Sequence, residues 1–225
     1  MKSVLISIQP KWCELIASGK KTVEVRKTRP KIETPFKCYI YCTKAKKHFS
    51  IGGGVYATSD TLYRLPTGEI KFGDGFELMG DWSGQYDENN FLNGKVIGEF
   101  VCDKIYNITP HFDNPDFCNQ YLCDWKWGEG TACLSFTEMN NYLKGKKGYG
   151  WHISDLVIYD KPKELSEFAR FCDGVGGNIG CRGCEYYYTE SNEGIGFYEE
   201  CGCNNSRPLR KPPQSWCFVE QEGRR

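Results

Sequence analysis

The sequence predicts an α+β fold: a small mixed β-barrel with helices packed against its outside. Strand-like and short helix-like segments follow one another without a regular strand–helix repeat, which argues against a doubly wound parallel sheet. The 225 residues are enough for one domain with a small appendage and for a real core. With 40% hydrophobic and 15% aromatic residues, the composition excludes a disordered or collagen-like chain.

The first 19 residues predict a strand followed by a short helix. Residues 4–8 are apolar except for Ser7, as in a buried strand. Pro10 suits the first turn of a helix, and Gly19 stands where that helix would end. Between them, large apolar side chains recur at helical spacing, at Trp12, Leu15 and Ile16.

The next segment alternates polar and apolar side chains, which is typical of a strand. Thr22, Glu24 and Arg26 would share one face of this strand. Lys21 falls out of phase with them. It can join their face only if the strand begins after it or contains a bulge.

Two further strands are predicted over residues 38–42 and 95–102. Between them, residues 43–94 read as an acidic insertion of short β-like pieces separated by glycine and proline turns. The glycine run at 52–54 is not a phosphate-binding loop, because no Gly-Lys-Ser/Thr follows it.

The rest of the barrel region predicts three helices and one strand. Residues 114–123 carry apolar side chains on one side of a helix. A capping box at its start predicts a short helix over residues 135–143. Residues 151–159 predict a long strand, and a proline opens a last helix over residues 162–171.

Charge is unevenly distributed along a chain whose formal net charge is zero. Residues 1–50 carry 12 Lys and Arg against 3 Asp and Glu, whereas residues 51–140 carry 5 against 14. The basic start would suit a polyanionic partner such as nucleic acid. The alternative is that the acidic middle folds over the basic start and neutralises it.

No apolar run approaches the roughly 20 residues that a membrane-spanning helix needs. Residues 1–10 contain only a short apolar stretch and no small-residue cleavage site. We therefore expect a cytoplasmic protein without membrane partners.

Residues 19–26 concentrate side chains that could act on a ligand. Arg26 offers a planar guanidinium suited to a phosphate or a base edge. Lys21 is a point charge that can bind phosphate or, when desolvated, act as a base. The alternative is a solvated basic hairpin in which Glu24 is only the local counter-ion.

The spacing Gly19-x-Lys21-x4-Arg26, after a strand and a short amphipathic helix, resembles the signature of the ASCH domain family. The β-barrel of that family is related to the PUA RNA-binding domain. The resemblance continues through residues 6–10, 38–43, 94–100 and 151–156. A variety with a Cys-rich tail, ending like residues 212–217 here, is found in phages and their bacterial hosts.

The resemblance implies a PUA-like domain over residues 1–165, interrupted by the insertion at 43–94, and a Cys-rich module over 166–225. It also implies a cleft that admits a nucleobase, a nucleoside or an RNA segment, lined by Lys21 and Arg26. Glu24 would lie beside them. The matching segments add further candidate ligand-binding residues: Ser7, Gln9, Trp151 and Ser154.

Two aromatic or titratable residues outside the motif need separate tests. Trp216 follows a proline pair near the chain end and could stack on a base, or it could pack on the core. His152, in the segment that resembles the family, is the histidine that most merits a test, although a lone histidine is usually structural.

Some ASCH members are amidohydrolases that remove the acetyl group from acetylcytidine. They use the motif lysine as base, a threonine three residues later as nucleophile and a distant glutamate as acid. Lys21 matches the base, but Glu24 stands at the nucleophile position and Thr22 is two residues away from it. Glu99 is a candidate for the acid. A carboxylate at position 24 could instead activate water or accept hydrogen bonds from cytosine or guanine.

The 13 cysteines fall into two groups, seven scattered through residues 1–133 and six in the last 54 residues. The scattered ones are expected to be buried as small apolar residues. The tail contains a Cys-x2-Cys knuckle, a spacing that supplies adjacent corners of a zinc tetrahedron. We expect a structural zinc held by Cys172, Cys181, Cys184 and Cys201, with Cys203 as the substitute for the last. A redox pair and plain buried thiols are the alternatives.

Three hypotheses of function follow. The first is a binding module for RNA or a single modified base. The second is an enzyme that uses Lys21 and Glu24, either an amidohydrolase on a modified nucleoside or a ribonuclease. The third is an interaction protein whose Cys-rich tail binds a protein partner. The carboxylate at position 24 favours the first, because a hydroxyl there would point to catalysis.

Overall fold

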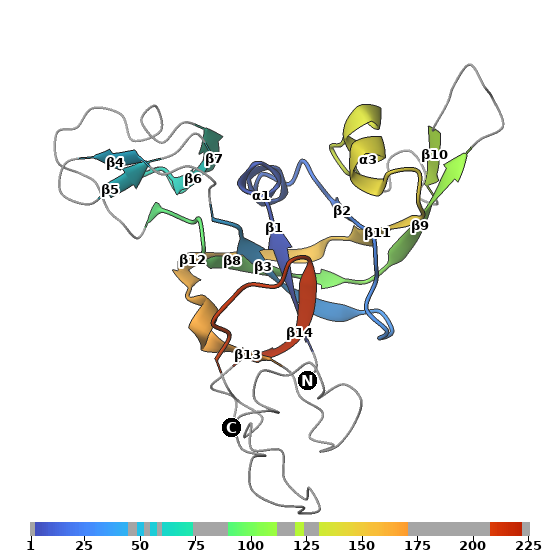
Figure 1. Cartoon of the computed structure of the whole chain (residues 1–225). Coiled ribbons are helices and arrows are strands. Elements are labelled where there is room, and N and C mark those ends of the chain that lie inside the picture. The colour runs from blue at the N-terminus through green and yellow to red at the C-terminus, as the bar shows by residue number, and fades with distance from the viewer. Residues whose placement is uncertain are drawn as a thin grey trace, which may run out of the picture.

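The computed structural model describes residues 3–44, 49–51, 55–57, 60–73, 90–111, 120–123, 131–170 and 208–221. The fold is mixed α+β and consists mostly of strands (Figure 1). The described helices are α1 (Pro10–Ala17), α3 (Phe136–Leu143) and the 3-10 turn η3 (Leu165–Glu167). The strands of the larger sheets are β1 (Ser3–Ile8), β2 (Val23–Arg26), β3 (Phe36–Cys42), β8 (Val96–Cys102), β9 (Ile105–His111), β10 (Gln120–Cys123), β11 (Gly148–His152), β12 (Ser154–Lys163), β13 (Phe168–Arg170) and β14 (Trp216–Gln221).

Two sheets organise the described strands. The larger has the order β12-β8-β3-β1-β14-β13, and the smaller has the order β10-β9-β11-β2. Strand β1 pairs in parallel with β3 and antiparallel with β14, so segments from the two ends of the chain lie side by side (Figure 1). The pairing of the described strands leaves both sheets open, and no closed barrel is found among them.

Two hairpins occupy the region expected to be an insertion of short β-like pieces. They pair β4 (Phe49–Ile51) with β5 (Val55–Ala57) and β6 (Thr61–Arg64) with β7 (Ile70–Gly73). The second hairpin lies against α1, because Leu62 and Ile70 join the same buried cluster as Cys13 and Ile16 of the helix.

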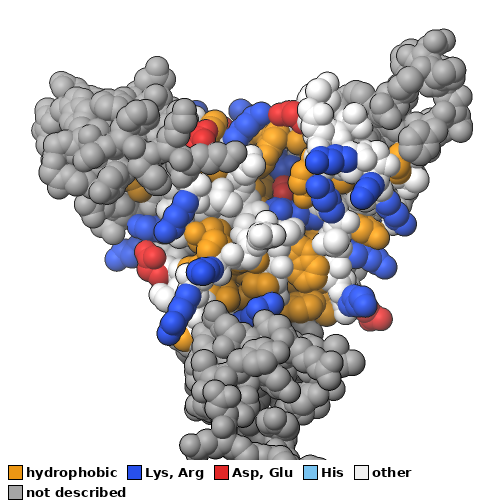
Figure 2. Space-filling view, in the orientation of Figure 1, with side chains coloured by type: hydrophobic (Ala, Val, Ile, Leu, Met, Phe, Trp, Pro, Cys, Tyr) orange, Lys and Arg blue, Asp and Glu red, His pale blue; other side chains and the backbone are white. Residues whose placement is uncertain are grey.

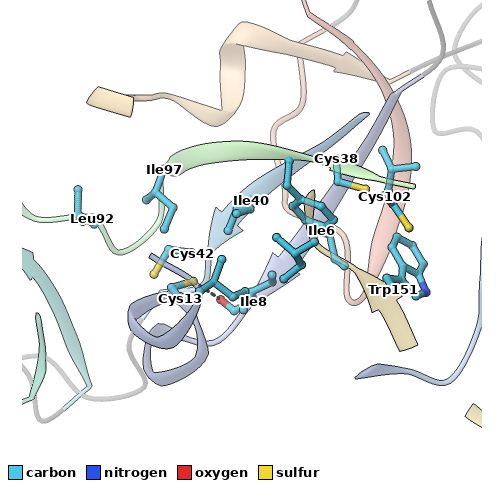
Figure 3. Close-up of a cluster of buried hydrophobic side chains, with 14 of the residues drawn as sticks. Ile6, Ile8, Cys13, Cys38, Ile40, Cys42, Leu92, Ile97, Cys102 and Trp151 are labelled. Carbon is cyan, nitrogen blue, oxygen red and sulfur yellow. Dashed lines mark hydrogen bonds between the residues drawn. The ribbon is translucent and has the colours of Figure 1, made fainter. Parts of the chain in front are cut away.

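The main core lies between α1 and the larger sheet. Ile6, Ile8, Ile16 and Ile40 are buried in it together with the indole of Trp151 (Figure 3). The alternation of β3 places Cys38, Ile40 and Cys42 on this side and Tyr39 and Tyr41 in a second cluster on the other.

Four of the seven cysteines scattered through residues 1–133 behave as small apolar residues, as expected. Cys13, Cys38, Cys42 and Cys102 are buried and are not in disulfides (Figure 3). Burial raises the pKa of the Cys13 thiol and that of the Cys38 thiol well above the ordinary value.

Several local predictions are confirmed. Gly19 follows α1 with a φ of 73°, as a C-terminal glycine should. Ser135 caps α3 with a capping box: its hydroxyl accepts a hydrogen bond from the backbone N–H of Glu138, and the Glu138 carboxylate accepts one from the backbone N–H of Ser135. The strand after Lys21 begins at Val23.

Two predicted helices are wrong. The described part of the segment 114–123 is strand β10, which pairs with β9. The segment 162–171 continues β12 to Lys163 and then forms η3 and β13. Pro162 is compatible with a strand here because β12 is an edge strand, where a missing N–H costs little. Pairing with another strand overrides the local helix preference in both places.

The predicted long strand over 151–159 is divided. Strand β11 ends at His152 and pairs with β2 and β9, whereas β12 begins at Ser154 and pairs with β8. The chain therefore passes from the smaller sheet to the larger one at Ile153. Among the described helices, none combines the length and the apolar composition required to cross a membrane.

Candidate functional site

A cavity of about 810 Å³ is lined by residues of both α1 and α3. Its walls come from the end of β1, the start of α1, strand β2 and residues 212–215. In Figure 2, acidic and basic side chains lie in the hollow between the two helices. Lys21, Glu24 and Arg26 all line it, so the structure brings together the three charged residues of the sequence motif.

Lys21 reaches this site because the helix ends before it and the strand begins after it. Its backbone N–H donates to the carbonyl oxygen of Leu15, which closes the turn after α1. Its ammonium donates a hydrogen bond of 2.6 Å to the carbonyl oxygen of Ala132 and lies 3.3 Å from Glu24 Oε2. The short strand thus solves the phase problem seen in the sequence, since Lys21 precedes the alternating residues.

Glu24 and Arg26 share one face of β2, as the alternation predicted. Arg26 Nη2 lies 2.9 Å from Glu24 Oε1 and donates to the carbonyl oxygen of Ser7 at 2.7 Å. The other face of β2 carries Val23 and Val25, which pack in a separate apolar cluster with α3. The strand therefore holds its charged face toward β1 and the cavity.

The three charges are almost completely removed from water. The side chains of Lys21, Glu24 and Arg26 are 2%, 7% and 8% exposed. Two cations and one carboxylate give this buried cluster of three residues a net charge of +1. Burial of such charges is costly unless every polar atom is paired, and here Glu24 Oε2 and Arg26 Nε have no hydrogen-bond partner among the described residues. The site is therefore electrostatically incomplete and favours a polar or anionic ligand.

Aromatic rings from both helices complete the walls. Trp12 of α1 and Tyr142 of α3 line the cavity and are half-buried. The Lys21 ammonium lies 5.2 Å from the Trp12 ring centroid, a cation–π distance. At the protein surface, Lys11 and Glu138 form a salt bridge of 3.0 Å that links α1 to α3.

Ser7 and Gln9 were expected at the site from the sequence, and both line the cavity. The Ser7 hydroxyl donates to the carbonyl oxygen of Pro213 at 2.7 Å, so it holds the 212–215 segment in the wall. Gln9 is exposed at the N-cap of α1, and its side chain makes no capping hydrogen bond. Because Gln9 is exposed and lines the cavity, it is accessible to a ligand there.

Three other candidate residues lie elsewhere. Trp151 is fully buried in the core, edge-on to Phe36, because β11 turns it inward. The Ser154 hydroxyl donates to the carbonyl oxygen of Val101 within the sheet. Trp216 packs against Trp151, and its Nε1 donates to Thr28 Oγ1. None of the three lines the cavity described above; in the described structure their side chains contribute to packing and strand pairing.

Glu99, the candidate acid, lies beside Lys37 and Tyr159 and does not line the described cavity. Burial opposes its ionisation, but hydrogen bonds from Lys37 and Tyr159 outweigh that effect and hold the pKa of Glu99 below its ordinary value. His152 Nδ1 lies 2.6 Å from Asp103 Oδ1, at the end of β11. Both groups are thus engaged away from Lys21 and Glu24.

Several residues at the site were not identified from the sequence. Trp12 was expected only as an apolar helix residue, and Tyr142 was not singled out. The carbonyl oxygen of Ala132 carries no sequence signal, because every residue has one. The proline-rich 212–215 segment was noted only for its resemblance to the family tail.

The predicted zinc ligands Cys172, Cys181, Cys184 and Cys201 lie outside the described residues, as does Cys203. Within the described ranges, no group of three or more His, Cys, Asp or Glu side chains is arranged to hold a metal ion.

Comparison with known proteins bears on the segment that carries the site. No curated protein matches the chain. A crystal structure of an ASCH protein from Zymomonas mobilis is similar at 19% identity and a TM-score of 0.39, covering 72% of this chain and 73% of that one. A tyrosine-to-phenylalanine variant of the same protein gives 20% identity and a TM-score of 0.39, covering 73% and 77%.

The family model of the ASCH domain matches residues 6–69, which span β1, α1, β2 and β3 and include all three charged residues of the cavity. Residues 6–69, the segment that carries the charged motif, therefore match the ASCH domain family.

Proposed function

We propose that the cavity binds a nucleobase, either within RNA or in a modified nucleoside, by the hydrogen-bonding edge of the base. The observation that carries this proposal is the buried Glu24 carboxylate, which is held between two cations at a cavity of about 810 Å³ and has one oxygen that accepts no hydrogen bond from the described residues. Cavities of this order accommodate small organic ligands.

The charges at the site match a base edge that carries a donor next to an acceptor. A carboxylate accepts hydrogen bonds from the exocyclic amino groups of cytosine or guanine. Lys21 and Arg26 are donors that suit a carbonyl oxygen or ring nitrogen beside that amino group. The rings of Trp12 and Tyr142 supply stacking surfaces on the walls.

The test is calorimetric titration of the full chain with cytidine, guanosine and uridine. We expect cytidine or guanosine to bind more tightly than uridine. Glu24→Gln should reduce that affinity by about 10–100-fold, the discrimination of one well-placed base contact. Glu69→Gln, which changes an exposed carboxylate paired with Lys71, is the matched control and should bind as the wild type does.

A second variant guards against misfolding, because Glu24→Gln leaves two buried cations without their counter-ion. Tyr142→Ala removes a wall ring without touching the ion pairs and should weaken binding of every base. If the wild-type protein binds none of the nucleosides at millimolar concentration, the proposal is wrong.

A hydrolytic function is the second candidate, and the same Glu24 oxygen, which accepts no hydrogen bond from the described residues, favours it. A desolvated carboxylate can act as a general base toward water, with Lys21 and Arg26 stabilising negative charge that develops on the substrate. The reaction would be deacetylation of an acylated nucleoside or cleavage of RNA. Mass spectrometry of acetylcytidine and of a short RNA incubated with the protein should then reveal product, and Lys21→Ala should abolish it.

Two finer parts of the fold expectation stay proposals. The first is that the ASCH region is a closed PUA-like barrel. The second is that residues 166–225 form a zinc-stapled module, through which a protein partner could bind. The module is glycine-rich and poor in aliphatic side chains, so a metal would replace a core that it cannot build by itself.

A further inference from the structure

An exposed surface beside the cavity combines lysine and arginine side chains with two tyrosine rings. We call it the basic–aromatic surface. Its cations are exposed and its rings half-buried. It comprises Lys27, Arg29, Lys144, Lys146, Lys147, Tyr142 and Tyr149.

Strand pairing explains why these residues gather. Strands β2 and β11 are antiparallel, and Arg26 at the end of β2 pairs with Tyr149 at the start of β11. Residues 27–29 leave β2, and residues 144–147 enter β11, at this same end of the ladder. In Figure 2, lysine and arginine side chains crowd the surface beside and below α3.

The cations lie over the rings in the described geometry. Lys27 Nζ is 5.0 Å from the Tyr142 ring centroid. The Arg29 guanidinium and Lys147 Nζ are each 5.7 Å from the centroid of Tyr149. A ring flanked by cations offers a base a stacking surface and its adjacent phosphates a positive charge in one place.

The surface is continuous with the cavity. Tyr142 lines the cavity wall and also carries Lys27 on its ring. Arg26 lies inside the cavity and Lys27, the next residue, is exposed outside it. A strand with one base in the cavity would therefore find cations for its backbone directly at the rim.

We propose that the basic–aromatic surface is the path of a single-stranded nucleic acid whose inserted base occupies the cavity. This inference rests on the proposed function and deepens it, because it names a polynucleotide strand, rather than a free nucleoside, as the ligand. An acidic peptide could use the cations, but it would gain nothing from the tyrosine rings or from a cavity that suits a base.

The test compares the affinity for a single-stranded RNA of about eight nucleotides with the affinity for the free nucleoside that carries the same base as the central nucleotide of that RNA. The double variant Arg29→Ala/Lys147→Ala removes the cations around Tyr149. We expect the RNA to bind at least 10-fold more weakly at low salt, and the slope of log affinity against log salt to flatten by about 1.4, or about 0.7 per lost phosphate contact. Binding of the free nucleoside should stay unchanged.

The matched control is Lys161→Ala/Arg170→Ala, which removes the same charge from exposed positions on β12 and β13. If this control weakens RNA binding as much as the test variant, the effect is one of net charge and the inference is overturned. An unchanged salt slope in the test variant also overturns it. So does equal competition by a glutamate decapeptide, which would assign the surface to an acidic protein.

The nucleoside titration tests the base-binding cavity, and the RNA titration tests the proposed path of the strand. Failure of the free nucleoside to bind the wild-type protein is evidence against the cavity. If the nucleoside binds normally but the affinity for RNA is unchanged in the Arg29→Ala/Lys147→Ala variant, only the proposed path of the strand is contradicted.

Discussion

The ammonium of Lys21 donates a hydrogen bond of 2.6 Å to the carbonyl oxygen of Ala132, which lies 111 residues further along the chain. The segment before α3 is thereby tied to the turn between α1 and β2. This bond holds the ammonium beside Glu24. It therefore keeps the walls of the cavity in place and keeps the cavity polar. The contact makes stability and ligand binding depend on the same side chain.

Removal of Lys21 should destabilise the fold. Lys21→Met takes one cation from a buried carboxylate, and breaking such a pair costs on the order of 3 kcal/mol. Urea unfolding should reveal this loss, whereas Lys20→Met, at the exposed neighbouring position, should change stability by less than about 0.5 kcal/mol. Equal stability of both variants would contradict the buried ion cluster.

Trp12 and Trp151 should respond in opposite ways to substitution by phenylalanine. Trp151 is fully buried in the core, so Trp151→Phe should leave a void, lower the free energy of unfolding by about 1–3 kcal/mol and leave base binding intact. Trp12 lines the cavity, so Trp12→Phe should weaken binding more than stability. Thermal unfolding and nucleoside titration of both variants check this, and loss of binding in folded Trp151→Phe would contradict the placement.

Acid should weaken the α1–α3 link. Hydrogen bonds from the Ser135 backbone, and then from Lys11, lower the pKa of Glu138 to about 2. The pKa of Glu138 in the folded protein lies below its ordinary value of about 4.3. Glu138 therefore stabilises the protein fully at pH values above about 4.3. The contribution is lost as the pH falls towards 2. Urea unfolding between pH 5 and 2 should show a smaller pH dependence for Glu138→Gln than for the wild-type protein, and identical curves would refute the prediction.

The buried thiols should be unreactive in the folded protein. Burial raises the pKa of Cys102 to about 12 and also raises the pKa of Cys13, so little thiolate forms at pH 8. Alkylation followed by peptide mapping should label both only after denaturation. Cys133, which is half-buried, should react faster and serves as the internal reference. Rapid labelling of Cys13 in the native protein would contradict the core described above.

The Cys-rich tail should bind one zinc ion per chain. Native mass spectrometry of the full chain should detect the metal, and a strong chelator should remove it and lower the thermal stability. Cys184→Ser should lose the zinc, because it breaks the Cys-x2-Cys knuckle, while Cys133→Ser should retain it. A metal-free wild-type protein prepared in zinc-containing buffer would refute this prediction.

Patterns within a few residues could be predicted from the sequence. The alternation at 22–26 correctly placed Glu24 and Arg26 on one face of β2. The capping box at Ser135 correctly marked the start of α3. These predictions worked because the interacting groups are neighbours in the chain and the backbone geometry alone relates them.

Segments whose state depends on a distant partner could not be predicted in this way. Residues 120–123 and 168–170 looked helical, but they are strands because β9 and β14 are available for pairing. Trp216 looked suitable for stacking on a ligand, but the pairing of β14 with β1 places it on Trp151. Local periodicity contains no information about which strand lies alongside.

The amino-acid sequence by itself determined the charged motif, its order along a helix–turn–strand unit, and the similarity of residues 6–69 to the ASCH domain. Only the tertiary structure decided that Lys21 is buried, that Ser7 and Pro213 close one wall, and that Trp12 and Tyr142 form others. The physical reason is that a motif specifies local backbone geometry. A cavity, in contrast, is the space left between elements, and its walls depend on how segments far apart in the chain pack together.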